Sequence, residues 1–459
     1  MAGMTALPVS ASQAGDASQF ETADSLVTQL EGVEVTANRA GVKTPVAFTN
    51  VSRKQLAKSN DGRDIPSLLE MTPSVVTTGD AGAGIGYSSL RVRGTDASRI
   101  NVTANGVPVN DSESHNVYWV NMPDLASSVN DIQIQRGAGT STNGAGAFGA
   151  SVNMITDFPS DVPSAMVSAS YGSYNTNRET VKVSSGLFGA HWSVDARFSH
   201  IGSDGYIDRA FTKLWSYMGQ LAYRGDNTTL RLLAFGGKER PYMAWDYASK
   251  EDMEKYGRRY NPCGQYTASD GSVAYYKDQC DNFTQHHLQL LLNQNIGQYV
   301  TLNAALHYTR GDGYYDQYKT RRTLEEYGLS PFLDAEGNLV EKSDLIRLKI
   351  NENDFGGGMF NLRYLKDALA ITAGAGINWF RGGHYGQVKW VRNFVGAIDP
   401  LQEYYNNTGR KFDSNVFLRG DYGFGAGFSA YADLQYRQID YTICLLYTSP
   451  SPRDTERSR

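Results

Sequence analysis

Hydrophobic and polar residues alternate along most of the chain between residues 164 and 443. The clearest runs are His191–Ser199, Tyr299–Thr309 and Phe428–Arg437. In each run one set of alternating positions is mainly aromatic or aliphatic, and the other is mainly polar. Because side chains alternate across a β-strand, this pattern predicts strands with one apolar and one polar face. Two-faced strands of about ten residues suit a transmembrane β-barrel.

The connections between these expected strands are of two kinds. Short turns are expected at Gly186–Ala190, Gly225–Asn227, Gly297, Lys366–Asp367 and Gly423–Gly427. They alternate with longer stretches, which are Gly202–Thr212, Lys238–Asn282, Asp312–Asn351 and Gly382–Arg410. Short turns on one side and long loops on the other are typical of outer-membrane barrels, which use even strand numbers. We count about eleven strands, so we expect residues 164–443 to be part of a larger barrel.

The chain before residue 164 follows a different pattern. Residues 44–157 predict a compact α/β domain of short elements. Its expected helices are Lys54–Ser59 and Asp64–Met71, and its expected strands are Ser89–Arg93, Ile100–Ala104, Val129–Gln135 and Ala150–Ile155. Residues 15–43 are polar and are expected to be flexible, apart from the strand-forming run Leu30–Arg39. The backbone of that run could pair with the sheet edge of another protein.

The two ends of the chain do not follow either pattern. Met1–Ala14 ends in small residues, and we interpret it as the remainder of an export signal. Cys444–Asp454 reads CLLYTSPSPRD, which resembles a translated sequencing adapter. We therefore expect residues 444–459 to be non-native.

Composition narrows the class of protein further. The chain of 459 residues contains 47 glycines and 29 tyrosines, with a net charge of −5. No stretch approaches the roughly 18–20 consecutive apolar residues of a transmembrane helix, which excludes a helical membrane protein. The acidic balance and the absence of a Lys/Arg run argue against a nucleic-acid partner.

The sequence shows no catalytic or metal-binding grouping. Gly144–Gly149 matches G-x-G-x-x-G, but a strand rather than a helix is expected after it, so we interpret it as a tight turn. His286 and His287 are adjacent and would point to opposite faces of a strand. We expect no enzyme activity, no cofactor and no metal site. His115, in the polar segment Asn110–Asn116, would either face a ligand or be solvated.

The long loops supply further candidate residues. Cys263 and Cys280 lie in Lys238–Asn282, and in an exported protein such a pair favours a disulfide over two free thiols. The same loops are rich in aromatic residues, which would either contact a bulky ligand or form a girdle at the membrane surface. The ligand-binding candidates are Tyr242, Trp245, Tyr247, Tyr314 and Tyr315.

Short motifs in the first 157 residues follow one another in a recognisable order. They are Pro73-Ser74-Val75, Leu90–Gly94 with Arg91, Arg93 and Gly94, Asn105-Gly106-Val107-Pro108, Gln135-Arg136-Gly137, and Gly144–Asn153 with Gly149. In this order and spacing they resemble the plug of TonB-dependent outer-membrane receptors, and the resemblance extends over Leu30–Ile443. Asn105 and Asn143 stand where the family often has Asp and Tyr.

The resemblance implies a 22-stranded barrel, filled by the plug, of which eleven strands are present. It also implies a TonB box at residues 30–37, with Leu30, Val33, Glu34, Val35, Thr36 and Ala37 pairing with TonB, which would transmit energy to the receptor. The expected activity is import of a scarce ligand, an iron–siderophore or similar metal chelate, across the bacterial outer membrane, whose lipid is a further partner. Haem and cobalamin remain alternatives. A passive porin or adhesin would need neither plug nor TonB box.

Overall fold

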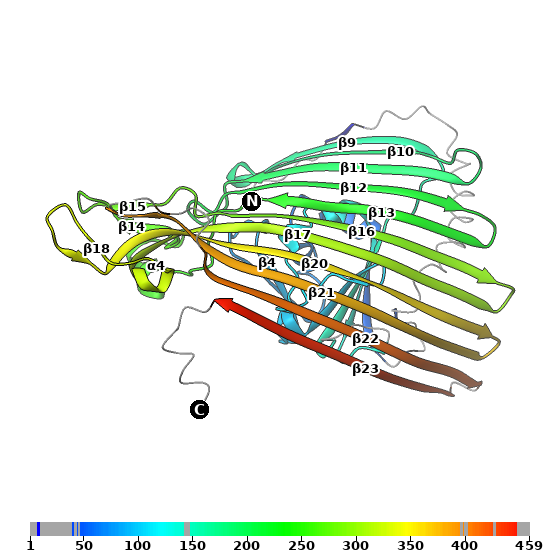
Figure 1. Cartoon of the computed structure of the whole chain (residues 1–459). Helices are drawn as coiled ribbons and strands as arrows, with labels where there is room; N and C mark the ends of the chain where they lie inside the picture. The colour runs from blue at the N-terminus through cyan, green and yellow to red at the C-terminus, as the bar shows by residue number, and fades with distance from the viewer. Residues whose placement is uncertain are drawn as a thin grey trace.

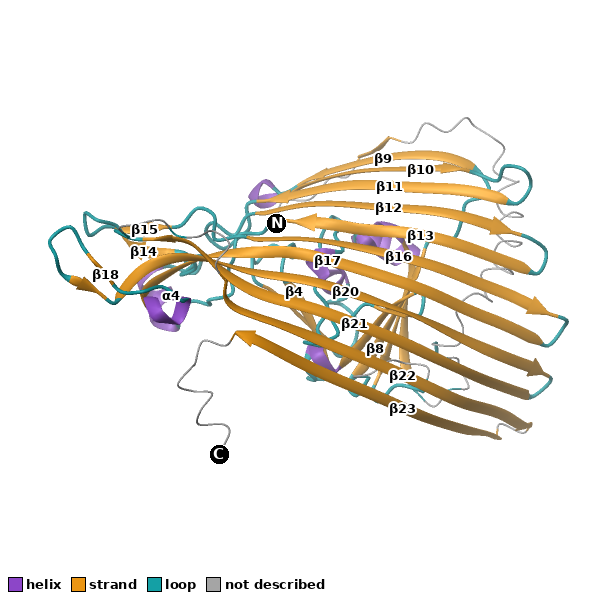
Figure 2. Ribbon diagram, viewed as in Figure 1, coloured by secondary structure: helices purple, strands orange, loops and turns teal. Residues whose placement is uncertain are grey.

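The computed structural model describes residues 7–9, 39–40, 44, 46–141, 147–394, 398, 403–425 and 428–447. A large curved sheet of long strands wraps around a smaller domain, drawn in blue and cyan in Figure 1. We call these parts the large sheet, whose strands run from β9 to β23 without the small hairpins β14–β15 and β18–β19, and the N-terminal domain, residues 46–157. Strands dominate both, and the few helices are short (Figure 2).

The large sheet is an antiparallel meander in chain order, with β1 (Leu7–Val9) added to β9 at one edge. From residue 163 onward it contains eleven strands, as the sequence predicts, and its first and last strands are not paired with each other among the described residues. The strands are β9 (Pro163–Tyr171), β10 (Asn177–Ser185), β11 (Trp192–Ser203), β12 (Thr212–Arg224), β13 (Thr228–Glu239), β16 (Asp281–Ile296), β17 (Val300–Thr323), β20 (Lys342–Lys366), β21 (Leu369–Val391), β22 (Glu403–Gly425) and β23 (Phe428–Tyr447).

The two faces of the large sheet are sorted as the alternation predicts, with the apolar face outward. In β11, Phe198 is 52% exposed whereas its neighbour Arg197 is 4% exposed. The polar side chains point toward the N-terminal domain, and the aromatic and aliphatic ones point away from it. A continuous apolar outer face of this kind is costly in water and suits contact with lipid. No helix in the described parts of the chain has the length and apolar character to span a membrane.

Several strands are longer than the sequence predicts. The expected loop Asp312–Asn351 is mostly strand, because β17 and β20 remain paired as far as Thr323 and Lys342. The expected loop Gly382–Arg410 is shortened in the same way by β21 and β22. Along the extension of β17 the residues show no regular alternation of apolar and polar side chains, although the backbone pairing continues. On β20, Ile346, Leu348 and Ile350 do alternate with polar residues, a short run that the sequence prediction did not use. In Figure 1 the β17–β20 hairpin projects beyond the other strands.

The tip of that hairpin and the connection after β13 carry short elements of their own. The tip contains η6 (Leu324–Tyr327), β18 (Phe332–Leu333) and β19 (Leu339–Val340). The connection between β13 and β16, which we call the long loop (residues 240–280), contains α4 (Lys250–Tyr256), β14 (Gln265–Thr267) and β15 (Val273–Tyr275). At the other end of the chain, β23 continues to Tyr447, past the expected boundary at Ile443.

The N-terminal domain is built on a five-stranded sheet in the order β2-β7-β8-β5-β6, in which only β5 and β8 are parallel. Buried aliphatic side chains of this sheet form its core together with the helices. The elements are β2 (Ala47–Ser52), α2 (Arg53–Ser59), α3 (Ile65–Leu68), β3 (Val75–Gly79), β4 (Ser88–Val92), η2 (Ala97–Arg99), β5 (Ile100–Ala104), β6 (Val107–Pro108), η3 (Trp119–Asn121), η4 (Leu125–Ser128), β7 (Val129–Arg136) and β8 (Ala150–Thr156). The second expected helix is shorter than predicted.

Two of the sequence motifs are turns that the backbone explains. Asn105 and Gly106 both have positive φ, 56° and 83°, which the tight β5–β6 turn requires and which Asn-Gly readily adopts. The Asn105 side chain also accepts a 3.0 Å hydrogen bond from the backbone of Thr156. At Gly149 a Cβ would lie 2.1 Å from Oγ1 of Thr95, so only glycine fits there. These residues therefore determine the local backbone conformation of the N-terminal domain.

Candidate functional site

A cavity of about 470 Å³ lies between the N-terminal domain and the inner face of the large sheet. The N-terminal domain contributes Tyr87, Tyr118 and the segment 108–112. The opposite side is supplied by the end of β13, the start of β16 and the middle parts of β17, β20 and β21, and Trp245 of the long loop also lines the cavity. Its volume is in the range of small-molecule sites, and both parts of the molecule form its surface.

Tyr87 connects the two sides of this cavity. It follows a glycine-rich stretch of the N-terminal domain, and its hydroxyl donates a hydrogen bond to Oδ2 of Asp281 in β16. Burial raises the pKa of Tyr87 well above its usual value, and the nearby carboxyls of Glu239 and Asp281 raise it further. The phenol therefore stays protonated and acts as a donor at neutral pH.

Two carboxyl groups lie side by side at this end of the cavity. Glu239 is the last residue of β13 and Asp281 the first of β16, and these strands are paired. Glu239 is 1% exposed, and among the described residues its Oε2 has no hydrogen-bond partner. A third carboxyl, Asp64 of the N-terminal domain, is buried nearby and accepts a 2.9 Å hydrogen bond from Ser88. Burial raises the pKa of Asp64 to about 7.

Aromatic rings surround the same end of the cavity. Trp245 packs edge-on against Tyr87, with ring centroids 5.6 Å apart, and against Tyr315, at 5.7 Å. The cavity also has one lysine in its lining, Lys349 of β20, whose Nζ lies 5.8 Å from the ring centroid of Tyr405. No described group of three or more His, Cys, Asp or Glu side chains is placed to hold a metal ion.

The structure brings together three of the six residues that the sequence suggested as ligand contacts. Trp245, Tyr314 and Tyr315 line the cavity. Tyr242 does not, because it is buried under the long loop, where its hydroxyl donates to the backbone of Cys263 and Tyr276.

The other two candidates lie elsewhere. Tyr247 is 74% exposed and donates a hydrogen bond to Asp80. His115 lines a separate, smaller cavity with Lys411, Asp413 and Arg437. Sequence reasoning missed Tyr87, Glu239 and Asp281. Glu239 stands in the charged run Lys238–Arg240, which by itself indicates only a solvated surface.

The two cysteines of the long loop are close neighbours in the fold but are not bonded in the structure. Cys263 and Cys280 are both free and belong to one buried cluster with Tyr242 and Met243. Burial raises the pKa of the Cys263 thiol to about 12 and that of Cys280 to about 11, so neither is reactive as a thiol at neutral pH. A disulfide between them stays a prediction.

The motif arginines belong to the N-terminal domain and do not line the cavity. Arg91 forms a 3.9 Å ion pair with Asp96 at the surface. Arg136 donates a 2.6 Å hydrogen bond to Thr49 of the neighbouring strand. Arg93, Gly94 and Gly137 have positive φ, so they shape turns. The expected TonB box at residues 30–37 lies outside the described residues.

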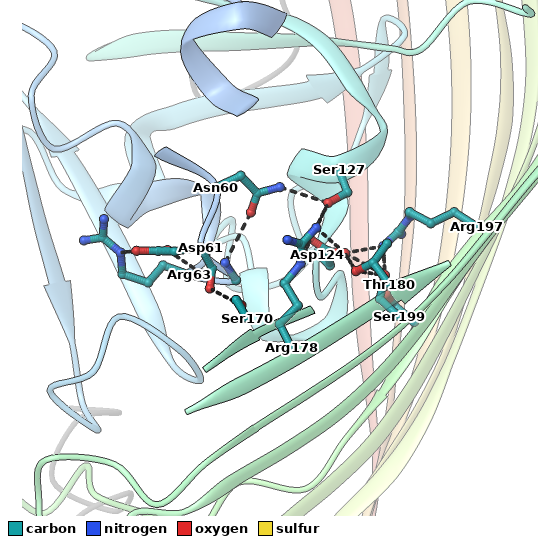
Figure 3. Close-up of polar contacts among 12 residues, drawn as sticks. Asn60, Asp61, Arg63, Asp124, Ser127, Ser170, Arg178, Thr180, Arg197 and Ser199 are labelled. Carbon is teal, nitrogen blue, oxygen red and sulfur yellow. Dashed lines mark hydrogen bonds and ion pairs between the residues drawn. The ribbon is translucent and has the colours of Figure 1, made fainter. Parts of the chain in front are cut away.

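A buried carboxylate, Asp124, attaches the N-terminal domain to the large sheet (Figure 3). Its oxygens form ion pairs of 3.1 Å with Arg178 of β10 and with Arg197 of β11. Hydroxyl groups of Thr180 and Ser199, on the same strands, donate further hydrogen bonds of 2.9 and 2.6 Å. The carboxylate is fully buried, so these bonds replace all of its contact with water.

The charge state of Asp124 follows from these contacts. Burial alone would raise the pKa of Asp124, but Arg197 and Arg178 together with the hydrogen bonds lower it below the usual value. The carboxylate is therefore ionised at neutral pH. The N-terminal domain is therefore held to the large sheet by a buried ionic contact between Asp124 and the two arginines.

Comparison with known proteins agrees with this architecture. Residues 40–151 match the family model described as the TonB-dependent receptor plug domain. A comparison with curated protein sequences finds no match. The N-terminal domain is thus a plug of this type, and the strands around it form part of a barrel.

Solved structures share the same fold. They include FpvA of P. aeruginosa bound to a ferric pyoverdine (TM-score 0.66, 14% identity, 88% of this chain and 52% of that one). The unliganded ferric citrate transporter FecA has a TM-score of 0.67 at 14% identity, with 90% and 58% covered. The ferric-catecholate import receptor Fiu of E. coli has 0.62 at 14%, with 90% and 63% covered. The chain therefore spans less than two thirds of these receptors, and its fold is that of TonB-dependent receptors of the bacterial outer membrane.

Proposed function

We propose that this protein binds a ferric chelate, of the siderophore type, in the cavity between plug and barrel and imports it with energy from TonB. The observation that carries the proposal is that residues of both the plug and the barrel line that cavity. A ligand bound there contacts both the plug residue Tyr87 and the barrel residue Asp281. Binding can therefore change the contacts that hold the plug inside the barrel.

The chemistry of the cavity supports a bulky, partly aromatic ligand. Its lining combines Trp245, Tyr314 and Tyr315 with a small number of charged and amide side chains. Tyrosine and tryptophan offer large flat contact areas together with hydrogen-bonding groups. Structures with the same fold were solved for a ferripyoverdine receptor and a ferric citrate transporter, which makes an iron chelate the first ligand class to test.

The plug supports active rather than passive transport. It lies inside the curved sheet and is tied to it by the buried Asp124 contact and by hydrogen bonds such as that from Asn105 to Gln289. Moving it requires breaking charged, desolvated contacts, which is costly without an external source of energy. A passive porin has no need of such a domain.

Uptake by cells tests this function. A strain that carries the gene and a deletion strain are compared for growth on single iron sources and for accumulation of radiolabelled ferric chelates, haem and cobalamin. We expect the deletion to abolish use of one or more ferric chelates, and a protonophore to abolish their accumulation while leaving surface binding intact. Dependence on haem or cobalamin alone would contradict the ligand class, and uptake that a protonophore leaves unchanged would contradict active transport.

A further inference from the structure

We propose that the cavity recognises a positively charged group on its ligand, an ammonium or guanidinium group, through the carboxyl groups of Glu239 and Asp281. This inference rests on the proposed function, since it specifies the ligand of the same cavity. It makes the ligand a chelate that carries a cationic substituent.

The first argument is the state of Glu239. Its side chain is 1% exposed and lines the cavity, and none of the described residues forms an ion pair or hydrogen bond with its Oε2. A buried carboxyl group without a partner is costly, whether it is charged or forced to remain protonated. A cation that enters the cavity removes that cost, and this gain appears directly as binding energy.

The second argument is the position of Asp281 and Tyr87. Asp281 lies at the start of the strand paired with β13, so two carboxyl groups face one end of the cavity. The Tyr87 hydroxyl occupies one oxygen of Asp281 and fixes the orientation of that group. The remaining acceptor oxygens suit the several N–H donors of an ammonium or guanidinium group.

The third argument is the aromatic surroundings. The ring of Trp245 packs edge-on against those of Tyr87 and Tyr315 in the lining of the same cavity. Aromatic faces attract organic cations, and tryptophan does so most strongly. Carboxyl groups combined with aromatic rings form an arrangement that favours a cation over a neutral group of the same shape.

Neither of the two other charged side chains in the cavity lining, Asp111 and Lys349, forms an ion pair or hydrogen bond with Glu239 among the described residues. Asp111 accepts hydrogen bonds from the backbone and side chain of Ser114, so its own loop satisfies it. Lys349 forms no ion pair with either carboxylate among the described residues, and it is available to an anionic part of the ligand. Because no group of three metal-ligating side chains is present among those residues, a bare metal ion is a poorer occupant than an organic cation.

Two matched pairs of probes test the inference on the purified protein in detergent, with quenching of tryptophan fluorescence as the readout. The first pair is ferrioxamine B, a linear ferric trihydroxamate with one free ammonium group, and its N-acetylated derivative, which lacks the charge. The second pair is phenethylammonium and 2-phenylethanol, which contain no iron. We expect the charged member of each pair to bind more tightly, by about 10-fold or more.

Variants assign the preference to these carboxyl groups. Glu239→Gln and Asp281→Asn keep the shape and remove the charge, so each should abolish most of the preference for the charged probe. Removing the unpaired Glu239 carboxyl should not lower thermal stability, so the Glu239→Gln variant separates loss of recognition from misfolding. Asp278→Asn is the matched control, since Asp278 is an exposed carboxylate of the long loop that connects the two strands, and it is paired with Arg240.

The two probe pairs separate failure of this inference from failure of the proposed function. If ferric probes bind but neither pair shows a charge preference, the cationic subsite is refuted and chelate import stands. If phenethylammonium binds in a Glu239-dependent way and no ferric chelate binds, the subsite stands and the proposed ligand class falls. If neither ferric nor amine probes bind with a charge preference dependent on Glu239, the inference is overturned.

Discussion

Asp124 is the residue on which attachment of the plug depends most directly. It has positive φ, 51°, a backbone conformation that asparagine also tolerates, so Asp124→Asn removes the charge without straining the chain. The substitution leaves Arg178 and Arg197 buried without their counter-charge, a loss of about 3–5 kcal/mol for a buried pair. We expect a loosened plug, measured as higher single-channel conductance and greater entry of large antibiotics.

An exposed pair provides the control for that experiment. Asp208 forms a 3.2 Å ion pair with Arg259 in which both side chains are about half exposed. Exposed pairs contribute about 0–1 kcal/mol, so Asp208→Asn should leave conductance unchanged. Equal conductance of the Asp124→Asn variant and the unmodified protein would contradict the role of Asp124.

Asp64 gives a prediction about pH. Its pKa is raised by burial to about 7, whereas in the unfolded chain it is close to 4. Between these values the folded state holds a proton that the unfolded state has lost, so stability falls as the pH rises through this window. Asp64→Asn cannot ionise and should be more stable than the unmodified protein at pH 8, by up to about 4 kcal/mol. Thermal unfolding at pH 5 and pH 8 measures the difference.

The exposed Asp96 provides a matched control for the pH experiment. Hydrogen bonds from Ser98 lower the pKa of Asp96, so Asp96→Asn should not gain stability at pH 8. A stability difference between Asp64→Asn and the unmodified protein that stays constant from pH 5 to pH 8 would count against the raised pKa.

At the level of single residues, the sequence identifies side chains by type but not by neighbour. Trp245, Tyr314 and Tyr315 could be named because aromatic residues in an exported loop are conspicuous. Glu239 and Asp281 could not, because their proximity arises from the pairing of β13 with β16 across the long loop. The absence of a partner for Glu239 is a property of the packed structure alone.

Among the elements, the segment Leu30–Ala37 carries the energy coupling that we propose. If TonB pairs with it as an added strand, Val35→Pro removes a backbone donor from that strand. We expect ligand binding to be normal and uptake to be lost, measured with radiolabelled chelate on whole cells. Val35→Ala keeps the donor and should import normally. Normal uptake by the proline variant would show that this segment is not the TonB box.

The long loop offers a second test at this scale. If Cys263 and Cys280 are bonded in the exported protein, then only Cys444 of the three cysteines reacts with a thiol reagent after denaturation without reductant. Closure of this loop would stabilise it by roughly 3 kcal/mol in the chain-entropy model. Cys263→Ser should then lower the temperature at which the loop becomes sensitive to protease. Reaction of all three thiols would rule out the bond.

The elements themselves were predicted well where one face is apolar. The strand Ile100–Ala104 and the helix after Ser52 match the sequence prediction closely, as does the count of eleven barrel strands. The prediction failed along the outer parts of β17 and β20, which were expected to be the loop Asp312–Asn351. There, β17 has no regular apolar alternation and β20 has only the short run of Ile346, Leu348 and Ile350, so the strands continue mainly through backbone pairing.

At the scale of the whole molecule, the plug and the barrel both line the cavity in which we propose that the ligand binds. We expect a bound ferric chelate to slow hydrogen exchange in the plug around Tyr87 and 108–112 and, to a similar degree, at the ends of β13 and β16. Protection confined to the loops would show that the ligand binds above the cavity. The plug-and-barrel plan could be predicted from ordered motifs and alternation, whereas this shared surface could not, since it depends on how two separately patterned parts fit together.

The hydrogen bond from Tyr87 to Asp281 crosses between those two parts, so a ligand bound as we propose would be coupled to the seating of the plug. Any ligand that binds more tightly while the plug is seated must, by the same factor, hold the plug in its seat. If the protein imports its ligand as we propose, high affinity and easy release are therefore opposed in this cavity. The work that drives the plug aside must include the coupling free energy of the ligand, so a tighter ligand requires a larger input of energy to enter the cell.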